Sequence, residues 1–297
     1  MRIAIVGAYG QLGTALRNEL PGDVRALGHE DIEISDPESV RDAIARTDSA
    51  LVINAAAYNF VDRAEDELSL AYNVNAIGPQ NLAIACKERS IPLVHVSTDY
   101  VFSGRQKSER GPVPRTVPYT ENDLPDPQGS YAKSKLAGEA FLQAQTKRHF
   151  IIRTCGLYGT TYKRGRGNFV ETVLRLAGER GELRIVNDQE CTPTSAADLA
   201  RAIRDLIKTK AYGLYHATNT GSTTWYGFAR EILRQAGVDV PLTPITTEQF
   251  AARAARPRYS VLNTGKLAAA IGGPLPPWQT ALAEYLAGRE ETTQNTK

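Results

Sequence analysis

Two residues of this sequence, Tyr131 and Lys135, have side-chain types and a spacing that suit proton transfer. Residues four apart on a helix lie on the same face, one turn from each other. A tyrosine has an ordinary pKa near ~10, which is too high for easy proton exchange at neutral pH. A lysine ammonium about 4.5 Å away stabilises the phenolate by roughly 3–4 kcal/mol at an effective dielectric constant of about 20. We therefore expect Tyr131 to transfer a proton and Lys135 to lower the pKa of Tyr131, provided that the rest of the chain builds a site around them.

A hydroxyl group is expected beside this pair, at the end of a neighbouring strand, because ligands of open parallel sheets bind at the carboxyl ends of the strands. The segment "HVSTDY" closes an apolar run and offers Ser97, Thr98 and Asp99 at that place. Either hydroxyl, that of Ser97 or that of Thr98, is suited to orient a carbonyl group. Their positions alone do not choose between them.

The segment "GAYGQLG" predicts a dinucleotide-binding loop. Its glycines, Gly7, Gly10 and Gly13, follow the apolar run 2–8 and open a helical pattern over 11–20. In this context Gly7 allows a tight turn, Gly10 lets the backbone approach a pyrophosphate, and Gly13 allows the helix to pack closely on the sheet. The helix N-terminus then presents N–H groups to the phosphates.

The end of the second expected strand, 23–28, leaves the choice of nicotinamide cofactor open. An acidic residue there typically binds the ribose 2′-hydroxyl of NAD, and Glu30 stands in the right place. Gly28 and His29 are equally suited to admit the 2′-phosphate of NADP.

Apolar runs and helical patterns alternate along the first half of the chain, which predicts a parallel sheet with helices on both faces. This is an α/β, Rossmann-type doubly wound fold, to which the second half adds a smaller substrate-binding lobe. We expect residues 1–155 to form the nucleotide-binding domain, to which residues 186–212 return, and residues 156–297 to form mainly the smaller lobe. The expected strands are 2–8, 23–28, 50–57, 92–102, 150–159, 183–186 and 214–219; the expected helices are 11–20, 36–45, 65–89, 131–147, 167–180 and 223–237, with a Pro-rich connector at 272–278 before a short last helix.

Composition and charge exclude several classes of protein. A formal net charge of +2 does not suit a nucleic-acid-binding protein, and no stretch approaches the roughly 20 apolar residues that span a bilayer. Cys86, Cys155 and Cys191 are far apart, so reduced core residues are expected rather than a zinc site. The chain enters a strand pattern at once, so no signal peptide is expected and the protein is placed in the cytoplasm. Arg164 and Arg166 are expected on a solvated loop.

A series of motifs follows in an order typical of one family, over about residues 1–285: "GAYGQLG", "VINAAAYNFVDRAE", "NVNAIGPQNLA", "VHVSTDYVFSG", "YAKSKLAGE", "IIRTCGLYG", "IVNDQECTPTS", "GLYHATNTGSTTWYGFA" and "RPRYSVLNT". Together they resemble the dTDP-4-dehydrorhamnose reductase family within the extended short-chain dehydrogenase/reductases. The resemblance implies a Rossmann fold and NAD(P)H-dependent reduction of the 4-keto group of a dTDP-6-deoxyhexose, in dTDP-L-rhamnose synthesis. It implies NADPH as cofactor, with NADH left open. A nucleotide sugar is the implied partner, with a homodimer left open and neither nucleic acid nor membrane expected.

The resemblance also implies roles for single residues. Thr98 would be the active hydroxyl, Tyr131 the proton donor, and Lys135 its helper on the nicotinamide ribose. The residues expected at the cofactor are Tyr131 and Lys135 together with Gly7, Gly10, Gln11, Leu12, Gly13, Ala55, Ala56 and Ala57. The residues expected at the substrate are Asp99, Gly156, Trp225 and Arg256, with packing as the alternative for Trp225 and a surface position as the alternative for Arg256. Asn75 is expected to make a structural contact between a helix and a strand.

Two departures from the family pattern bear on function. After the strand 150–159 the family commonly has a tryptophan that covers the sugar, and this place is Gly156 here. We therefore expect an open pocket and weaker discrimination among sugars. Some members also hold Mg²⁺ between subunits with acidic residues, and the corresponding places here are Ala15 and Ala197. Because Mg²⁺ needs oxygen ligands, no intersubunit metal is expected.

Two other functions remain open from the sequence. A regulatory subunit of methionine adenosyltransferase is similar to the same family but does not catalyse a reaction, and nucleotide-sugar epimerases and dehydratases share the superfamily. The complete set of Thr98, Tyr131 and Lys135 favours an enzyme over a binding subunit. The "TDY" form of the segment after the fourth strand favours a reductase over a dehydratase.

Overall fold

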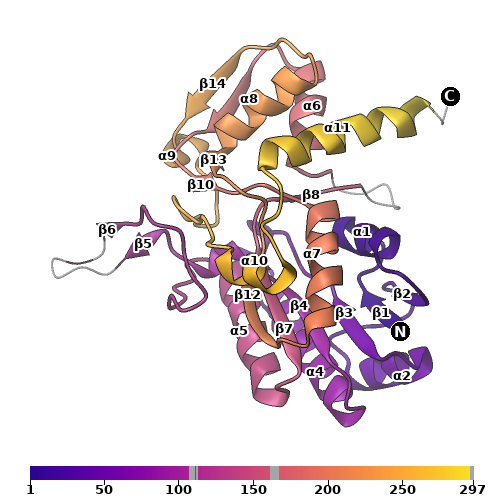
Figure 1. Cartoon of the computed structure of the whole chain (residues 1–297). Helices are drawn as coiled ribbons and strands as arrows, with labels where there is room; N and C mark the ends of the chain where they lie inside the picture. The colour runs from indigo at the N-terminus through magenta and orange to yellow at the C-terminus, as the bar shows by residue number, and fades with distance from the viewer. Residues whose placement is uncertain (107–110, 112, 161–166, 295–297) are drawn as a thin grey trace.

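A six-stranded parallel sheet forms the centre of the molecule (Figure 1). The computed structural model describes residues 1–106, 111, 113–160 and 167–294; the loop predicted around Arg164 and Arg166 lies outside them. The strand order is β12-β7-β4-β3-β1-β2 and all neighbours are parallel, which confirms the predicted Rossmann-type α/β fold class. The strands are β1 (Ile3–Val6), β2 (Val24–Leu27), β3 (Leu51–Asn54), β4 (Leu93–Thr98), β7 (His149–Thr154) and β12 (Gly213–His216).

Helices cover both faces of the sheet because its central strands are apolar on both sides. β1 (IAIV) and β3 (LVIN) are buried at every position, as strands between two helical layers are. On one face lie α1 (Gln11–Glu19), α7 (Ala196–Thr209) and α10 (Gly265–Ile271). On the other lie α2 (Pro37–Thr47), α4 (Gly78–Glu88) and α5 (Ser130–Gln145).

The helix predicted over 65–89 is divided into shorter pieces. A 3₁₀ turn, η1 (Arg63–Glu65), and a short helix, α3 (Leu68–Tyr72), precede a π-helical turn, η2 (Asn73–Ile77), and α4 follows. Pro79 in the first turn of α4 has no N–H to donate to Asn75, so the regular hydrogen-bond pattern cannot continue through this point.

Asn75 makes the structural contact that was expected of it, although its partners are a loop and a helix. Its side chain accepts a hydrogen bond of 2.9 Å from the backbone N–H of Tyr58 and donates one of 3.0 Å to the hydroxyl of Ser134 on α5. A Cβ atom on Gly138 would lie 2.1 Å from the carbonyl oxygen of Asn75. Helix α5 therefore packs directly on the π-helical turn.

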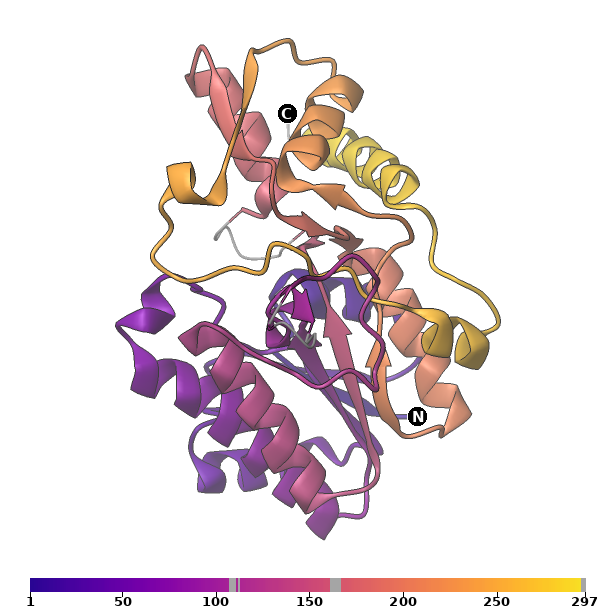
Figure 2. The same cartoon turned by 90° about the vertical axis from the view of Figure 1, so that its left-hand side faces the viewer.

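Part of the second half of the chain forms a smaller lobe at one end of the sheet (Figures 1 and 2). Strands β9 (Leu183–Val186) and β14 (Leu242–Ile245) pair in parallel. Helices α6 (Phe169–Glu179), α8 (Trp225–Gln235) and α11 (Trp278–Gln294) enclose a core that includes Tyr158 and Phe228. Short elements complete the structure: η3 (Asp99–Val101), β5 (Arg105–Gln106), β6 (Val113–Pro114), β8 (Leu157–Tyr158), β10 (Glu190–Cys191), β11 (Thr194–Ser195), β13 (Thr223–Thr224) and α9 (Thr247–Phe250).

The chain returns to the sheet over a longer stretch than the expected 186–212. Helix α7, which the sequence analysis did not predict, leads into β12 at one edge of the sheet, and α10 packs beside both. The last helix, α11, has 17 residues rather than being short. The division into domains stays a prediction. In the part of the chain that the structure describes, no helix combines the length and the apolar character needed to cross a membrane.

Candidate active site

Helix α5 places Tyr131 and Lys135 against the carboxyl end of β4. Tyr131 lies in the first turn of α5, beside the hydroxyl of Thr98, the last residue of β4. One turn later, the buried ammonium of Lys135 donates a hydrogen bond of 2.6 Å to the carbonyl oxygen of Val96. Two elements, α5 and β4, therefore bring the three predicted residues together.

Burial sets the proton affinity of both side chains. It raises the pKa of Tyr131 well above its ordinary value, while the hydrogen bond with Thr98 acts in the opposite direction. It lowers the pKa of Lys135 to about 8, against an opposing effect of the Glu139 charge. The pKa of Tyr131 is thus raised overall, although the sequence predicted a lowered one, because removing the phenol from water outweighs the effect of Thr98. Tyr131 is thus held protonated, which is the form that a proton donor needs.

The two candidate hydroxyls of β4 have different surroundings. Ser97 donates a hydrogen bond of 2.5 Å to Glu139, which also forms a buried ion pair of 2.7 Å with Arg153. Thr98 instead contacts the tyrosine and donates a hydrogen bond of 3.1 Å to Asp99. The hydroxyl beside the tyrosine is therefore that of Thr98.

Asp99, which was expected at the substrate, is buried next to this pair and is only 2% exposed. Burial raises its pKa to about 6, and hydrogen bonds from Cys155, Ser260 and Thr98 oppose that shift. Two effects raise the pKa of Cys155 well above its ordinary value: the larger is a hydrogen bond with the thiol of Cys191, and the second is burial. These cysteines are buried thiols inside the fold, and the contacts of Asp99 are with such core groups and with Thr98.

Close backbone contacts explain two of the three glycines in the loop after β1. Gly7 has a φ angle of +77°, and a Cβ atom there would lie 2.6 Å from the backbone nitrogen of Ala56. A Cβ atom on Gly13 would lie 2.2 Å from the carbonyl oxygen of Gly7. Gly10 is exposed, and a Cβ atom on it would meet only that same oxygen, at 3.5 Å. The loop therefore packs tightly against the protein at Gly7 and Gly13, and its backbone is accessible to a ligand at Gly10.

The residues around this loop fit the phosphate end of a dinucleotide. Leu12 is buried in the core beneath the sheet, so its backbone rather than its side chain is available to a ligand. The side-chain oxygen of Gln11 is buried and has no hydrogen-bond partner among the described residues. Residues 55–57 follow β3 and are half-buried, and the side chain of Asn54 accepts a hydrogen bond of 3.1 Å from the N–H of Ala56. The side-chain oxygen of Gln11 is an acceptor and so is left for a donor group of a ligand, while the exposed backbone at Gly10 is left for the phosphates.

Two residues that the sequence analysis did not single out, Tyr9 in the loop after β1 and Arg17 on α1, lie near the end of β2. The ring of Tyr9 packs so closely on Gly28 that a Cβ atom there would lie 2.8 Å from it. The guanidinium carbon of Arg17 lies 5.2 Å from the centre of the same ring. His29 and Glu30 are both exposed. A cation therefore stands near the place where nicotinamide dinucleotides differ at the ribose.

A cavity of about 240 Å³ lies between the sheet and the lobe. Tyr100 lines this cavity and connects it to the candidate active site, because its ring lies edge-on to that of Tyr131 with the ring centres 6.1 Å apart. Aromatic faces pack on sugars and bases, and guanidinium groups bind phosphates. The residues of these two types in its wall are Tyr100, Phe169, Trp225, Phe250, Arg184 and Arg256. Only Trp225 and Arg256 were predicted; Tyr100 lies in the quoted segment "HVSTDY" but was given no role, and Phe169, Arg184 and Phe250 were not singled out.

The place where the family has a tryptophan is not left open. Gly156 has a φ angle of +53°, and a Cβ atom on it would lie 3.4 Å from the indole of Trp225. That indole also packs against Phe169, with ring centres 4.7 Å apart. Tyr158 is fully buried in the core of the lobe and lies away from this wall. The pocket is therefore not open at Gly156 as expected, because the indole of Trp225 closes the wall there.

A second cavity, of about 280 Å³, contains both places at which the family resemblance puts a metal ion. Ala15 of α1 and Ala197 of α7 line this cavity, and neither side chain offers an oxygen ligand. Across the residues that the structure describes, no group of three or more His, Cys, Asp or Glu side chains is arranged to hold a metal ion.

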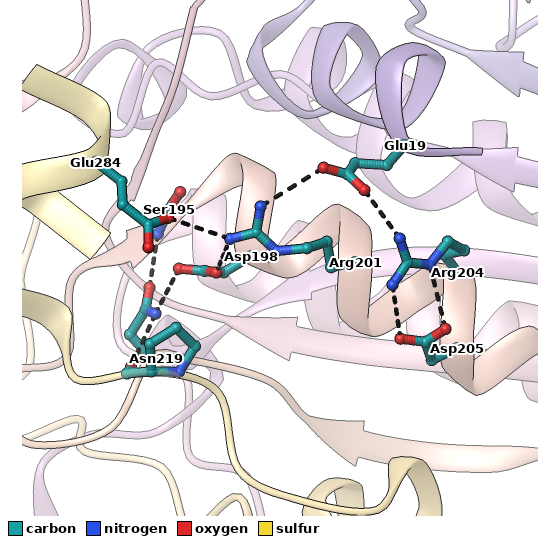
Figure 3. Close-up of polar contacts among 9 residues, drawn as sticks. Glu19, Ser195, Asp198, Arg201, Arg204, Asp205, Asn219 and Glu284 are labelled. Carbon is teal, nitrogen blue, oxygen red and sulfur yellow. Dashed lines mark hydrogen bonds and ion pairs between the residues drawn. The ribbon is translucent and has the colours of Figure 1, made fainter. Parts of the chain in front are cut away.

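An arginine supplies the positive charge at this second cavity (Figure 3). The guanidinium group of Arg201 contacts the carboxylates of Asp198, of Glu19 on α1 at 3.5 Å and of Glu284 on α11 at 3.4 Å. Asp198 also accepts a hydrogen bond of 2.7 Å from Asn219. Because these carboxylates are already paired with a guanidinium group, the residues here do not fit a bound divalent cation.

Comparison with known proteins identifies the family. The family model described as the RmlD substrate binding domain matches residues 1–290. The chain belongs to this family. A dTDP-4-dehydrorhamnose reductase of Mycobacterium tuberculosis (strain H37Rv) is 40% identical, over 98% of this chain and 94% of that protein.

Solved structures of RmlD-family proteins have the same fold. A dTDP-4-dehydrorhamnose reductase from Clostridium acetobutylicum matches with a TM-score of 0.90 and 40% identity, over 98% of this chain and 100% of that one. Another from Bacillus anthracis, in complex with NADP, matches with a TM-score of 0.89 and 39% identity, over 97% and 99%. The family predicted from the motifs is confirmed.

We predict that removing divalent cations changes neither the stability nor the activity of this RmlD-family protein. Arg201 forms ion pairs with the three carboxylates at this place, and Ala15 and Ala197 offer no oxygen ligand, so we expect no bound cation for a chelator to remove. The melting temperature, the oligomeric state and the rate of NADPH oxidation should be the same before and after dialysis against EDTA. Loss of activity in EDTA that Mg²⁺ restores would contradict this prediction.

Proposed function

We propose that this protein reduces the 4-keto group of a dTDP-6-deoxyhexose, with dTDP-4-dehydrorhamnose as the expected substrate and dTDP-L-rhamnose as the product. The observation that carries the proposal is Tyr131 buried beside Thr98 at the carboxyl end of β4, next to a cavity lined by aromatic groups and arginines. The full-length relatives support the substrate class, since they are dTDP-4-dehydrorhamnose reductases.

NADPH is the proposed cofactor, and it supplies the hydride when bound. The exposed backbone at Gly10 suits its phosphates. The guanidinium group of Arg17 suits its 2′-phosphate, and the related Bacillus anthracis structure contains NADP. NADH stays the alternative, and the ratio of the dissociation constants of the two cofactors decides between them.

In the proposed reaction, Tyr131 gives the proton of its hydroxyl to the sugar oxygen at C4 as negative charge develops there. Its raised pKa keeps that proton in place until the oxygen becomes basic. Thr98 holds the phenol in position and is placed to hydrogen-bond the same sugar oxygen. Lys135, fixed to Val96, keeps an ammonium one turn from the phenolate that forms, and water then returns the proton.

The side chains that line the cavity suggest where the diphosphate, the base and the sugar of the substrate bind. The guanidinium groups of Arg184 and Arg256 suit the diphosphate. The rings of Phe169 and Phe250 suit the thymine base, and the indole of Trp225 beside Gly156 suits the sugar.

The proposed setting is the cytoplasm, with the nucleotide sugar as the partner molecule. The buried free thiols of Cys86, Cys155 and Cys191 support a reducing compartment. A homodimer stays a prediction, to be tested by the mass of the protein in solution.

We predict that Gly10→Ala weakens NADPH binding by about tenfold, equal to about 1.4 kcal/mol, without lowering the melting temperature. The backbone of Gly10 (φ −76°, ψ 178°) suits alanine, and the new methyl group would meet only one oxygen, at 3.5 Å. It would, however, stand where the pyrophosphate approaches the loop. Fluorescence titration gives the dissociation constant, and Gly178→Ala, on an open face of α6, is the control. An unchanged dissociation constant would show that the phosphates bind elsewhere.

We predict that Tyr131→Phe lowers kcat by about 10²–10⁴-fold, the usual loss when a general acid is removed. The dissociation constant for NADPH should stay within a factor of about two, because the phenyl ring keeps its place in the first turn of α5. Turnover is followed by NADPH oxidation with dTDP-4-dehydro-L-rhamnose. A variant with near-normal turnover would remove Tyr131 from the reaction and favour a different proton donor.

We predict that Trp225 makes the wild-type protein select one sugar stereoisomer. An apolar wall contributes ~1–3 kcal/mol to discrimination, so Trp225→Leu should lower the ratio of kcat/KM values by about 10–100-fold. The ratio is measured with dTDP-4-dehydro-L-rhamnose and its C5 and C2 stereoisomers. Phe250→Leu, in the same cavity but half exposed, should leave the ratio unchanged. A wild-type protein that accepts the isomers equally would restore the open-pocket expectation for Gly156.

A further inference from the structure

One turn of the chain contacts both the helix that carries Tyr131 and the segment that carries Arg256. Residues 62–66, called the 62–66 turn here, include η1 and follow β3. The segment 251–262 passes beside this turn where it crosses between the lobe and the sheet (Figure 2). Ala64 at the centre of the turn is fully buried in a cluster that also packs against Tyr131. The turn is therefore fixed in the protein rather than being a surface loop.

Glu65 closes the N-terminus of α5. Its carboxylate accepts a hydrogen bond of 2.8 Å from the backbone N–H of Ser130 and another of 2.8 Å from the hydroxyl of the same residue. The residue before the helix, Gly129, offers no side-chain cap, and a Cβ atom there would lie 3.0 Å from Glu65. A carboxylate at a helix N-terminus is favoured by the unpaired N–H groups and the helix dipole. Since Tyr131 is the next residue, Glu65 sets where its backbone begins.

Asp62 holds Arg256 by two parallel hydrogen bonds. The distances are 3.0 and 2.8 Å, and the same carboxylate accepts a bond of 3.0 Å from the backbone N–H of Ala254. A two-pronged contact of this kind fixes both the place and the plane of a guanidinium group. Arg256 lines the substrate cavity and also bonds to Tyr100, whose ring lies edge-on to that of Tyr131.

We propose that the 62–66 turn sets the distance between the proton donor and the anion-binding arginine, with Glu65 as the positioning residue for Tyr131 and Asp62 as the positioning residue for Arg256. This inference rests on the proposed function, because it takes Tyr131 as the proton donor and Arg256 as a ligand of the substrate diphosphate. The 4-keto group and the diphosphate belong to one substrate molecule and are joined through its sugar ring. A protein that must contact both at once gains from placing the two contacting residues on a single support.

The kinetic test separates the two halves of the turn. Asp62→Asn should raise KM for the nucleotide sugar by about tenfold with kcat within about twofold, because it loosens a binding group. Glu65→Ala should lower kcat by about 10–100-fold with KM little changed, because it misplaces the proton donor. Glu65→Gln should recover most of that loss, since its amide oxygen can still accept from Ser130. Arg63→Gln, which removes an exposed ion pair with Glu67 in the same turn, should leave both constants unchanged.

Hydrogen exchange tests the same inference without any activity. Glu65→Ala should speed exchange of the Ser130 amide but not of the Ala254 amide. Asp62→Asn should speed exchange of the Ala254 amide but not of the Ser130 amide. A wild-type protein that reduces no dTDP-4-keto sugar would refute the proposed function, and exchange would still decide whether the turn positions these segments. If neither variant changes exchange at its own amide, the positioning proposal is overturned. It is also overturned if Glu65→Gln is as slow as Glu65→Ala, or if Arg63→Gln lowers kcat equally.

Discussion

The hydrogen bond from the ammonium of Lys135 to the carbonyl oxygen of Val96 is the contact on which the candidate site depends. It compensates a buried charge and sets the register of α5 against β4. Residues at four-residue spacing on α5 therefore all meet the end of this strand: Tyr131 reaches the hydroxyl of its last residue, and Glu139 reaches the hydroxyl before it. A loss of this register would move the proton donor and the buried ion pair together.

Arginines organise the rest of the molecule, and their surroundings decide what each of them can do. Arg201 is enclosed by carboxylates from three helices and joins α1, α7 and α11 where some relatives, by resemblance, use a metal. Arg256 has a single carboxylate partner, Asp62, and keeps part of its surface in the substrate cavity. Both guanidinium groups are thus held by carboxylates, but only that of Arg256 lines the cavity beside Tyr100.

Sequence patterns predicted those parts of the fold and of the site that depend on residues close together in the chain. The loop at Gly7 and Gly13 was predicted because its glycines occur at a characteristic spacing within one short strand–turn–helix segment. The break at Pro79 and the helix α7 were missed, although both leave signals, a proline in a helical run and apolar residues at helical spacing. The contact between Trp225 and Gly156 was not predictable, because it joins residues far apart in the chain. The pKa of Tyr131 was wrongly anticipated, since burial, which dominates it, has no sequence signal.

Transfer of deuterium from NADPH to the sugar tests the central claim most directly, namely that this chain reduces a nucleotide sugar at C4. NADPH deuterated at C4 of the nicotinamide, on one face and then on the other, is given to the protein with dTDP-4-dehydro-L-rhamnose. One of the two cofactors should yield a product with a single deuterium at C4 of the sugar for each NADPH oxidised. A product without deuterium at that carbon from either cofactor, or no oxidation of NADPH at all, would contradict the claim.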